Sequence, residues 1–283
     1  MKYFRFHLKT NLKLFIYVIG FSLCMDLLVF AASMSNVVVE GFLRPVIISL
    51  CITVLSVLII FFFIYRLSKK NEPFFDLLNE KGACDELLVM YRQLHPRMNP
   101  VHHVSLASYL TVMGRYDEAE YELSFAGNSY LADVLTKAYY SESLIDLRIR
   151  QNRFDEAIML YNNYSSMMNA FCRSRKNTAI CVLHYANGAL LYAHSGDFNS
   201  AMICIKDMER FISKERKFAF TRNTALMGVY LIKGDYRSAD EIKSLMLKDL
   251  DTCDCFDMKY ESDFARKDIN DTVNRFDPRV PRL

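Results

Sequence analysis

The sequence predicts an all-α protein in which two membrane-spanning helices precede an array of helical hairpins. Three observations predict this fold class: two apolar runs near the N-terminus, a short turn motif that recurs along the rest of the chain, and helical spacing of apolar residues before each turn. We expect a membrane anchor over residues 1–70, a helical repeat domain over 71–250, and a capping helix with a mobile tail over 251–283.

The anchor contains two apolar runs of about 20 residues, the length that a helix needs to cross about 30 Å of hydrocarbon. The run from Leu14 to Met34 is interrupted only by Asp26, and the run from Val46 to Tyr65 carries no charge. A buried helix of a soluble protein rarely stays apolar on every face for this length. We therefore expect transmembrane helices over residues 14–34 and 46–65.

The charges beside the two runs predict the orientation of the anchor. Lysine and arginine residues precede the first run and follow the second, whereas the connection from Ser35 to Leu43 carries only Glu40. Because positive residues prefer the cytoplasmic side, both termini should be cytoplasmic and the connection should lie on the extracytoplasmic side of the membrane. The repeat domain then faces the cytoplasm, and the short hairpin anchor favours a bacterial source.

A cleaved signal peptide is the alternative interpretation of the first run, because Ala31, Ala32 and Ser33 offer small residues after it. The run is longer than the usual apolar region of a signal peptide and contains an acid, which favours a spanning helix.

Asp26 is the one ionisable residue inside the two predicted spans, and Thr53 lies at a similar depth on the second. Ionisable groups inside a membrane are functional candidates by default. The alternative is that Asp26 bonds to Thr53 and fixes the helix hairpin. The spans offer no second ionisable residue for a proton relay, which favours the structural role.

A turn motif of Gly or Asn, an aromatic residue two positions later and Ala three positions after that occurs four times. The copies begin at Gly114, Asn152, Gly196 and Gly234, in steps of 38, 44 and 38 residues, and a degraded copy begins at Gly82. Gly and Asn tolerate the left-handed backbone that ends a helix. The aromatic residue fills the junction between two helices, and the small Ala allows them to approach closely. The motif therefore predicts a series of helical hairpins.

These motifs resemble the centre of the tetratricopeptide repeat (TPR), a helix–turn–helix unit of 34 residues. The resemblance covers 73–250; the chain departs from the family in having no Trp, no Pro closing each unit and longer steps. It implies a TPR-like α-solenoid that binds a protein or peptide partner in a concave groove lined by the first helix of each pair. The residues that it places in the groove are Ser108, Thr111, Tyr139, Glu142, Asp146, Arg150, Asn187, His194 and Thr224.

The acidic residues Glu142 and Asp146 predict that the partner is a basic or amphipathic segment, with Tyr139 supplying apolar contact area. Carboxylates four residues apart on a helix could also carry acid–base chemistry, but a solvated face is the commoner explanation. No phosphate loop, nucleophile elbow or zinc-protease motif occurs in the sequence, so we expect neither an enzyme nor a cofactor.

Other ligand classes are not favoured by the sequence. A net charge of +3 is too small to predict nucleic acid binding, and the Cys253–Cys255 pair lacks the second pair or the histidines of a metal site. Two basic runs at 173–176 and 214–222 admit two interpretations, solubility or contact with anionic lipid.

We therefore expect a membrane-anchored interaction scaffold or adaptor. The alternatives are a membrane sensor or regulatory subunit that relays a signal through the helix hairpin, and an enzyme whose site has no recognisable motif. A repeat fold alone does not name the partner, since such folds bind many unrelated ligands.

Overall fold

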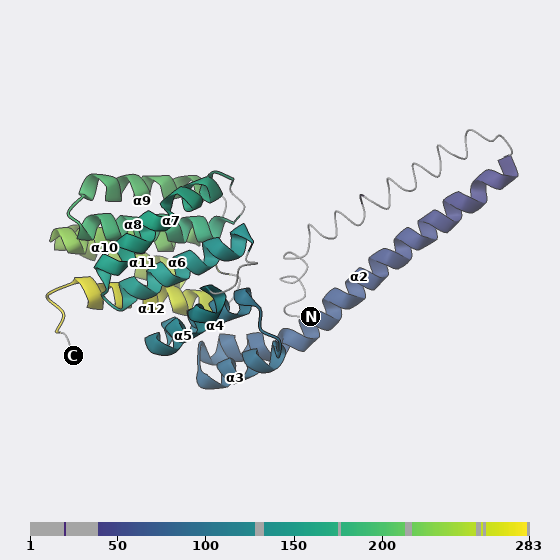
Figure 1. Cartoon of the computed structure of the whole chain (residues 1–283), viewed down its shortest axis with the longest axis horizontal. Coiled ribbons are helices and arrows are strands. Elements are labelled where there is room, and N and C mark those ends of the chain that lie inside the picture. The colour runs from purple at the N-terminus through teal and green to yellow at the C-terminus, as the bar shows by residue number, and fades with distance from the viewer. Residues whose placement is uncertain are drawn as a thin grey trace. The chain divides into compact units, whose positions relative to one another are not determined.

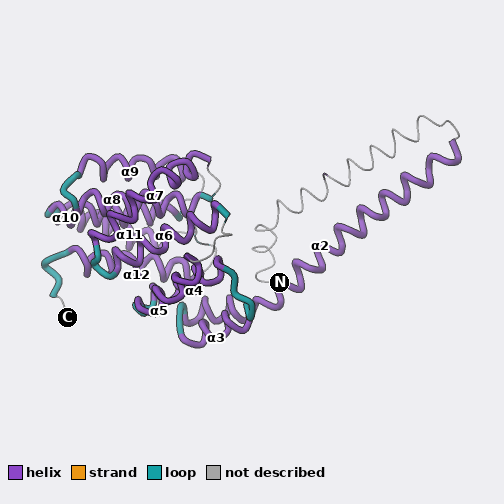
Figure 2. The backbone as a smooth tube through the Cα atoms, viewed as in Figure 1, coloured by secondary structure: helices purple, strands orange, loops and turns teal. Residues whose placement is uncertain are grey.

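The computed structural model describes Gly20 and residues 39–127, 133–174, 177–212, 217–252, 256 and 259–281. The predicted first span over 14–34, including Asp26, lies outside these residues apart from Gly20, and so do Cys253 and Cys255. Within the described ranges every regular element is an α-helix, which confirms the predicted all-α class. Figure 2 shows these helices joined by short loops.

The chain divides into two compact units, Met1–Leu77 and Leu78–Leu283. Helix α2 (Val39–Lys81), whose last four residues belong to the second unit, contains the predicted second span. From Cys51 onward this helix is long and apolar enough to cross a membrane, with a mean hydropathy of 2.3 over its most apolar part. The helix runs 16 residues past Tyr65, because the charged residues that follow are compatible with a helix, and it ends before Gly82, whose φ is +71°.

Ten further helices follow α2 in the described part of the second unit, as labelled in Figure 1. Their bounds are α3 (Asp85–Leu94), α4 (Pro100–Val112), α5 (Tyr116–Gly127), α6 (Val134–Arg150), α7 (Phe154–Ser174), α8 (Thr178–His194), α9 (Phe198–Ile212), α10 (Phe218–Lys233), α11 (Tyr236–Thr252) and α12 (Lys259–Phe276).

Consecutive helices from α4 to α11 pack as four pairs: α4 with α5, α6 with α7, α8 with α9, and α10 with α11. The first helices of the pairs also contact one another in the order α4, α6, α8, α10, and each second helix contacts the first helix of the next pair. An apolar core cluster lies among α6–α10 and includes Met168, Phe171, Ala189 and Phe211. Each pair therefore buries its apolar face against its neighbours in sequence.

The four predicted turns have one geometry. Gly114, Asn152, Gly196 and Gly234 all have a left-handed backbone, with φ values of +79°, +58°, +82° and +82°. In each turn the N–H of this residue donates to the carbonyl three residues before it, and the next N–H donates to the carbonyl five residues before it. These paired bonds satisfy carbonyls that the end of a helix leaves without partners, as in a Schellman motif.

The alanines of the motif are buried as predicted. Ala119, Ala157 and Ala201 are 0% exposed and Ala239 is 1% exposed. The step of 44 residues, the longest of the three, contains α7, which at 21 residues is longer than α5, α9 or α11. The variable spacing thus comes from the lengths of helices and leaves the turns unchanged.

The C-terminal region forms the predicted helix, α12, which begins at Lys259. This helix contacts both α10 and α11. Ile269 and Val273 of α12 join a core cluster with Met227 and Leu231 of α10 and Ala239 of α11. The second half of α12 therefore closes the apolar core of the last pair.

Candidate partner-binding cavity

A cavity of about 980 Å³ lies among the first helices of the four pairs. One wall is formed by α4, α6, α8 and α10, and the opposite wall by α12 with Phe256. Residues between Leu78 and Ala83 contribute as well, at the end of α2. Cavities of this size hold small ligands or peptide side chains.

The predicted groove residues separate into two sets. The residues that line the cavity are Ser108, Thr111, Tyr139, Asp146, Arg150 and Thr224, and those that do not are Glu142, Asn187 and His194. Six of the nine residues that the TPR resemblance places in the groove therefore line the cavity, and three do not.

Glu142 and Asn187 require a correction, because they are 0% and 2% exposed and bond to each other. The amide of Asn187 donates to Glu142 Oε2 at 3.1 Å, and Glu142 Oε1 lies 2.8 Å from His184 Nδ1. His184 in turn stacks on Tyr161, with ring centroids 4.8 Å apart. The carboxylate is thus committed to a buried network between α6 and α8, and it cannot attract a basic partner.

His194, Thr111 and Thr224 also have less to offer a partner than predicted. His194 is exposed at the end of α8 and stacks on Phe154, with ring centroids 4.0 Å apart. The Thr111 hydroxyl donates to the Ala107 carbonyl at 2.8 Å, and the Thr224 hydroxyl lies 3.8 Å from Met246 Sδ. Both hydroxyl groups therefore already have a partner within the domain.

Arg150 is a charged residue of the cavity wall with several acidic neighbours. Its guanidinium donates to Asp146 Oδ2 at 2.9 Å and to Asp268 Oδ1 at 2.8 Å, and Asp271 lies 3.8 Å away. Burial alone would lower the pKa of Arg150, but Asp146 and Asp268 outweigh burial and raise it. Arg150 is therefore a fixed cation that links α6 to α12.

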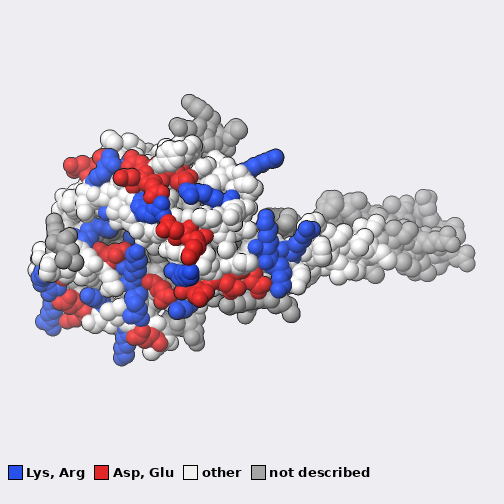
Figure 3. Space-filling view, turned by 90° about the horizontal axis from the view of Figure 1, so that it is seen from below, with Lys and Arg blue, Asp and Glu red and all other residues white. Residues whose placement is uncertain are grey.

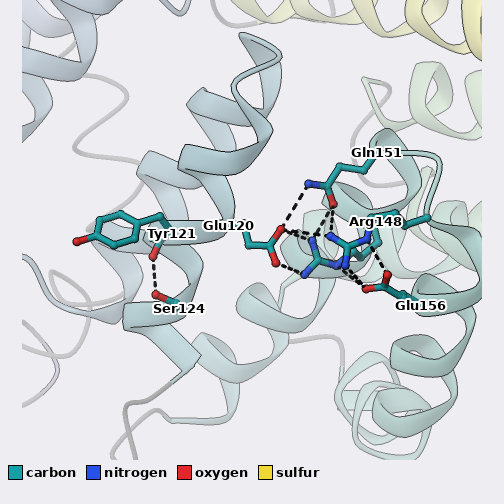
Figure 4. Close-up of polar contacts among 7 residues, drawn as sticks. Glu120, Tyr121, Ser124, Arg148, Gln151 and Glu156 are labelled. Carbon is teal, nitrogen blue, oxygen red and sulfur yellow. Dashed lines mark hydrogen bonds and ion pairs between the residues drawn. The ribbon is translucent and has the colours of Figure 1, made fainter.

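Arg148, two residues earlier on α6, belongs to a different network that links α5, α6 and α7 (Figure 4). Its guanidinium binds both carboxylate oxygens of Glu120 and donates to Gln151 Oε1 at 2.7 Å. Glu156 lies 3.3 Å from Arg148 Nε on the other side. The hydrogen bond with Arg148 holds the pKa of Glu120 below its ordinary value. This network joins neighbouring pairs outside the cavity.

The α12 side of the cavity was not predicted from the sequence. Lys217 of the α10 side pairs with Glu261 at 3.1 Å, and Lys267 Nζ donates to the Val112 carbonyl at 2.5 Å. The available signal was the spacing of Glu261, Asp268 and Asp271, which lie seven and three residues apart and so share one face of a helix.

Other ligand classes gain no support from the described residues. Within them, no group of three His, Cys, Asp or Glu side chains could hold a metal ion. Figure 3 shows acidic and basic side chains interspersed over the face drawn there. In the predicted basic runs, Lys217 is paired with Glu261, and Arg222 lies 3.5 Å from Glu209.

Comparison with known proteins gave no match: no family model, no curated protein and no solved structure resembles this chain significantly.

Proposed function

We propose that the protein is a membrane-anchored adaptor whose TPR-like α-solenoid binds a polypeptide segment in the cavity of about 980 Å³. The cavity carries this proposal, because its wall is built from α4, α6, α8 and α10, the helices that the repeat pattern assigns to the concave surface. Its lining combines apolar and aromatic side chains such as Tyr139 and Phe264 with charged groups such as Arg150, so a partner could both bury side chains and form ion pairs there.

The solenoid part of the proposal is supported by repetition of both turns and contacts. Four turns share the same left-handed residue and the same pair of hydrogen bonds. Each first helix contacts the next first helix and the preceding second helix, so that contacts are made between neighbours in sequence, as in solenoid proteins.

A cross-linking experiment tests the binding site. A photoreactive amino acid at Ser143, which lines the cavity from α6, should capture a partner protein in native membranes. The matched control is the same amino acid at Tyr121, which is 64% exposed on α5 and does not line the cavity. Equal capture from both positions, or capture from Tyr121 alone, would contradict the proposed site.

The proposed topology has two spans and both termini in the cytoplasm, and it is supported by α2 and by the flanking charges. After Cys84, Cys253 and Cys255 are replaced by Ser, a membrane-impermeant thiol reagent should label Asn36→Cys from outside intact cells. It should label Asn71→Cys only after the membrane is opened. Labelling of both positions in intact cells would place the repeat domain outside the cytoplasm.

A sensor or regulatory subunit is the second candidate, and one observation favours it. Helix α2 is continuous from Val39 to Lys81, and its last residues, Leu78 and Lys81, line the cavity. If Asp26→Asn abolishes the biological response and leaves the Ser143 cross-link intact, the sensor role is favoured over the adaptor role.

A further inference from the structure

Helix α12 is held to the domain in two different ways along its length. Its buried residues, Ile269, Thr272 and Val273, all lie in the second half. That half also packs against α10, where a Cβ added at Gly228 would lie 3.4 Å from Thr272 Cγ2. The first half, Lys259–Asp268, which we name the strap, has no buried residue. Ala265 of the strap is partly buried and packs against the core cluster of α10 and α11, so the strap contributes less to the apolar core than the second half does.

Polar contacts attach the strap to the cavity wall. They include the pairs Lys217–Glu261 and Arg150–Asp268 and the bond from Lys267 to the Val112 carbonyl. Elsewhere the strap donates from the Tyr260 N–H to Asn79 Oδ1 at 3.4 Å and from Arg266 to Asp251 Oδ1 at 2.7 Å. Phe264, which lines the cavity from the strap, is 42% exposed. A cavity of about 980 Å³ lies beside the strap, so apolar packing between the strap and the cavity wall is incomplete and the polar contacts contribute to its attachment.

The two walls of the cavity carry opposite charge. The wall outside α12 supplies the cations Lys81, Arg150 and Lys217 against the single acid Asp146. The strap supplies Glu261, Asp263 and Asp268 against the single cation Lys267. Lys81 also pairs with Glu86 at 2.9 Å, so the contrast is strongest at Arg150 and Lys217. Such complementarity selects a partner by charge more than it adds affinity.

We propose that the cavity binds an acidic amphipathic helix of the partner protein. In the absence of the partner the strap occupies the same position, and the partner helix displaces it. This inference rests on the proposed function and gives the partner its chemistry: carboxylates that replace Asp268 on Arg150 and Glu261 on Lys217, with an aromatic side chain in the place of Phe264. A tethered segment competes at a high effective concentration, so the strap sets a threshold for binding. The partner is thus acidic and amphipathic, whereas the sequence alone predicted a basic or amphipathic segment.

A labelled synthetic peptide of residues 256–271 is the probe, and the full chain in lipid nanodiscs is the receptor. The test variant of the chain carries Glu261→Lys and Asp268→Lys, which place like charges against Lys217 and Arg150 and should release the strap. The peptide should then bind this opened chain at least about tenfold more tightly than it binds the wild-type chain. The control, Glu241→Lys plus Asp249→Lys, makes the same change in charge at exposed positions of α11 and should have no such effect.

A charge swap tests the specific pairs. Adding Arg150→Glu and Lys217→Glu to the opened chain should restore the pairs with reversed polarity, close the strap and reduce peptide binding to the wild-type level. Circular dichroism checks that each variant is folded. In the wild-type chain, which avoids any question of misfolding, saturating peptide should increase hydrogen exchange at 259–268 more than at 269–276.

Several results would overturn the inference. They are equal peptide binding by the opened and wild-type chains, unchanged exchange at 259–268 with peptide bound, or equally tight binding of a peptide in which the positions of Glu261 and Asp268 are lysine. These results would leave the Ser143 cross-link unaffected, so failure of the strap and failure of the proposed adaptor function can be told apart.

Discussion

Two polar side chains on α6, Glu142 and Arg150, were both predicted to face a partner, and the structure gives them opposite roles. Glu142 is sealed between α6 and α8 and bonds to His184 and Asn187. Arg150 lies eight residues later, lines the cavity and binds α12 through Asp268. The two positions differ by about two turns of one helix, so they share a face, and the neighbouring helices decide which of them a partner can reach.

The largest expected effect is at the sealed position. Glu142→Ala should destabilise the domain by about 3–5 kcal/mol, because it leaves His184 and Asn187 buried without their acceptor. Urea denaturation of the detergent-solubilised chain measures this loss as a lower midpoint.

Asp146→Ala is the matched control, one turn away on the same helix. Arg150 keeps Asp268 in that variant, and Asp146 is 24% exposed, so the cost should be only about 1 kcal/mol. If Glu142→Ala and Asp146→Ala lower the free energy of unfolding equally, burial does not determine how much each carboxylate contributes to stability.

The features that the sequence predicted correctly depend on neighbouring residues, and those that it missed depend on distant ones. A left-handed residue at Gly196 and a buried Ala201 belong to one turn, so a motif of six residues was sufficient to predict them. The partner of Glu142 is 42 residues away at His184, and Asp268 is 118 residues from Arg150. Periodicity in one helix carries no information about such contacts, which is why the strap was not predicted.

The next largest loss of stability is expected from overpacking between α8 and α9. Ala201→Leu should cost about 1–3 kcal/mol, because Ala201 is 0% exposed in the core between α8 and α9 and a larger side chain overpacks it. The same substitution at Ala179, an exposed residue at the start of α8, should change the stability by less than about 0.5 kcal/mol. Thermal denaturation of both variants checks the difference, and an unchanged melting temperature for Ala201→Leu would contradict the close approach of these helices.

The smallest effect is expected at the third polar group of α6, where Arg148 holds Glu120. The hydrogen bond from Arg148 lowers the pKa of Glu120 from its ordinary value of 4.5. A lowered folded-state pKa means that the carboxylate contributes stability above about pH 4.5 and that this contribution disappears as the pH falls through the folded value. Glu120 is 40% exposed, so solvent screening should limit the contribution to less than about 1 kcal/mol.

Other carboxylates with lowered pKa values, such as Asp197 and Asp235, will also weaken the fold in acid, so the wild-type curve alone cannot isolate Glu120. The informative quantity is the difference in melting temperature between wild type and Glu120→Gln, followed from about pH 7 to about pH 3. We expect wild type to be the more stable at neutral pH and the difference to shrink below about pH 4.5, where both chains carry an uncharged group.

The exposed Glu241→Gln should show a smaller difference, because its i,i+4 pair with Arg237 joins side chains that are 66% and 91% exposed. A difference for Glu120→Gln that stays constant over this range would mean that packing, and not the charge, links α5 to α6. The partly exposed Arg148–Glu120 contact would then contribute to stability mainly through packing.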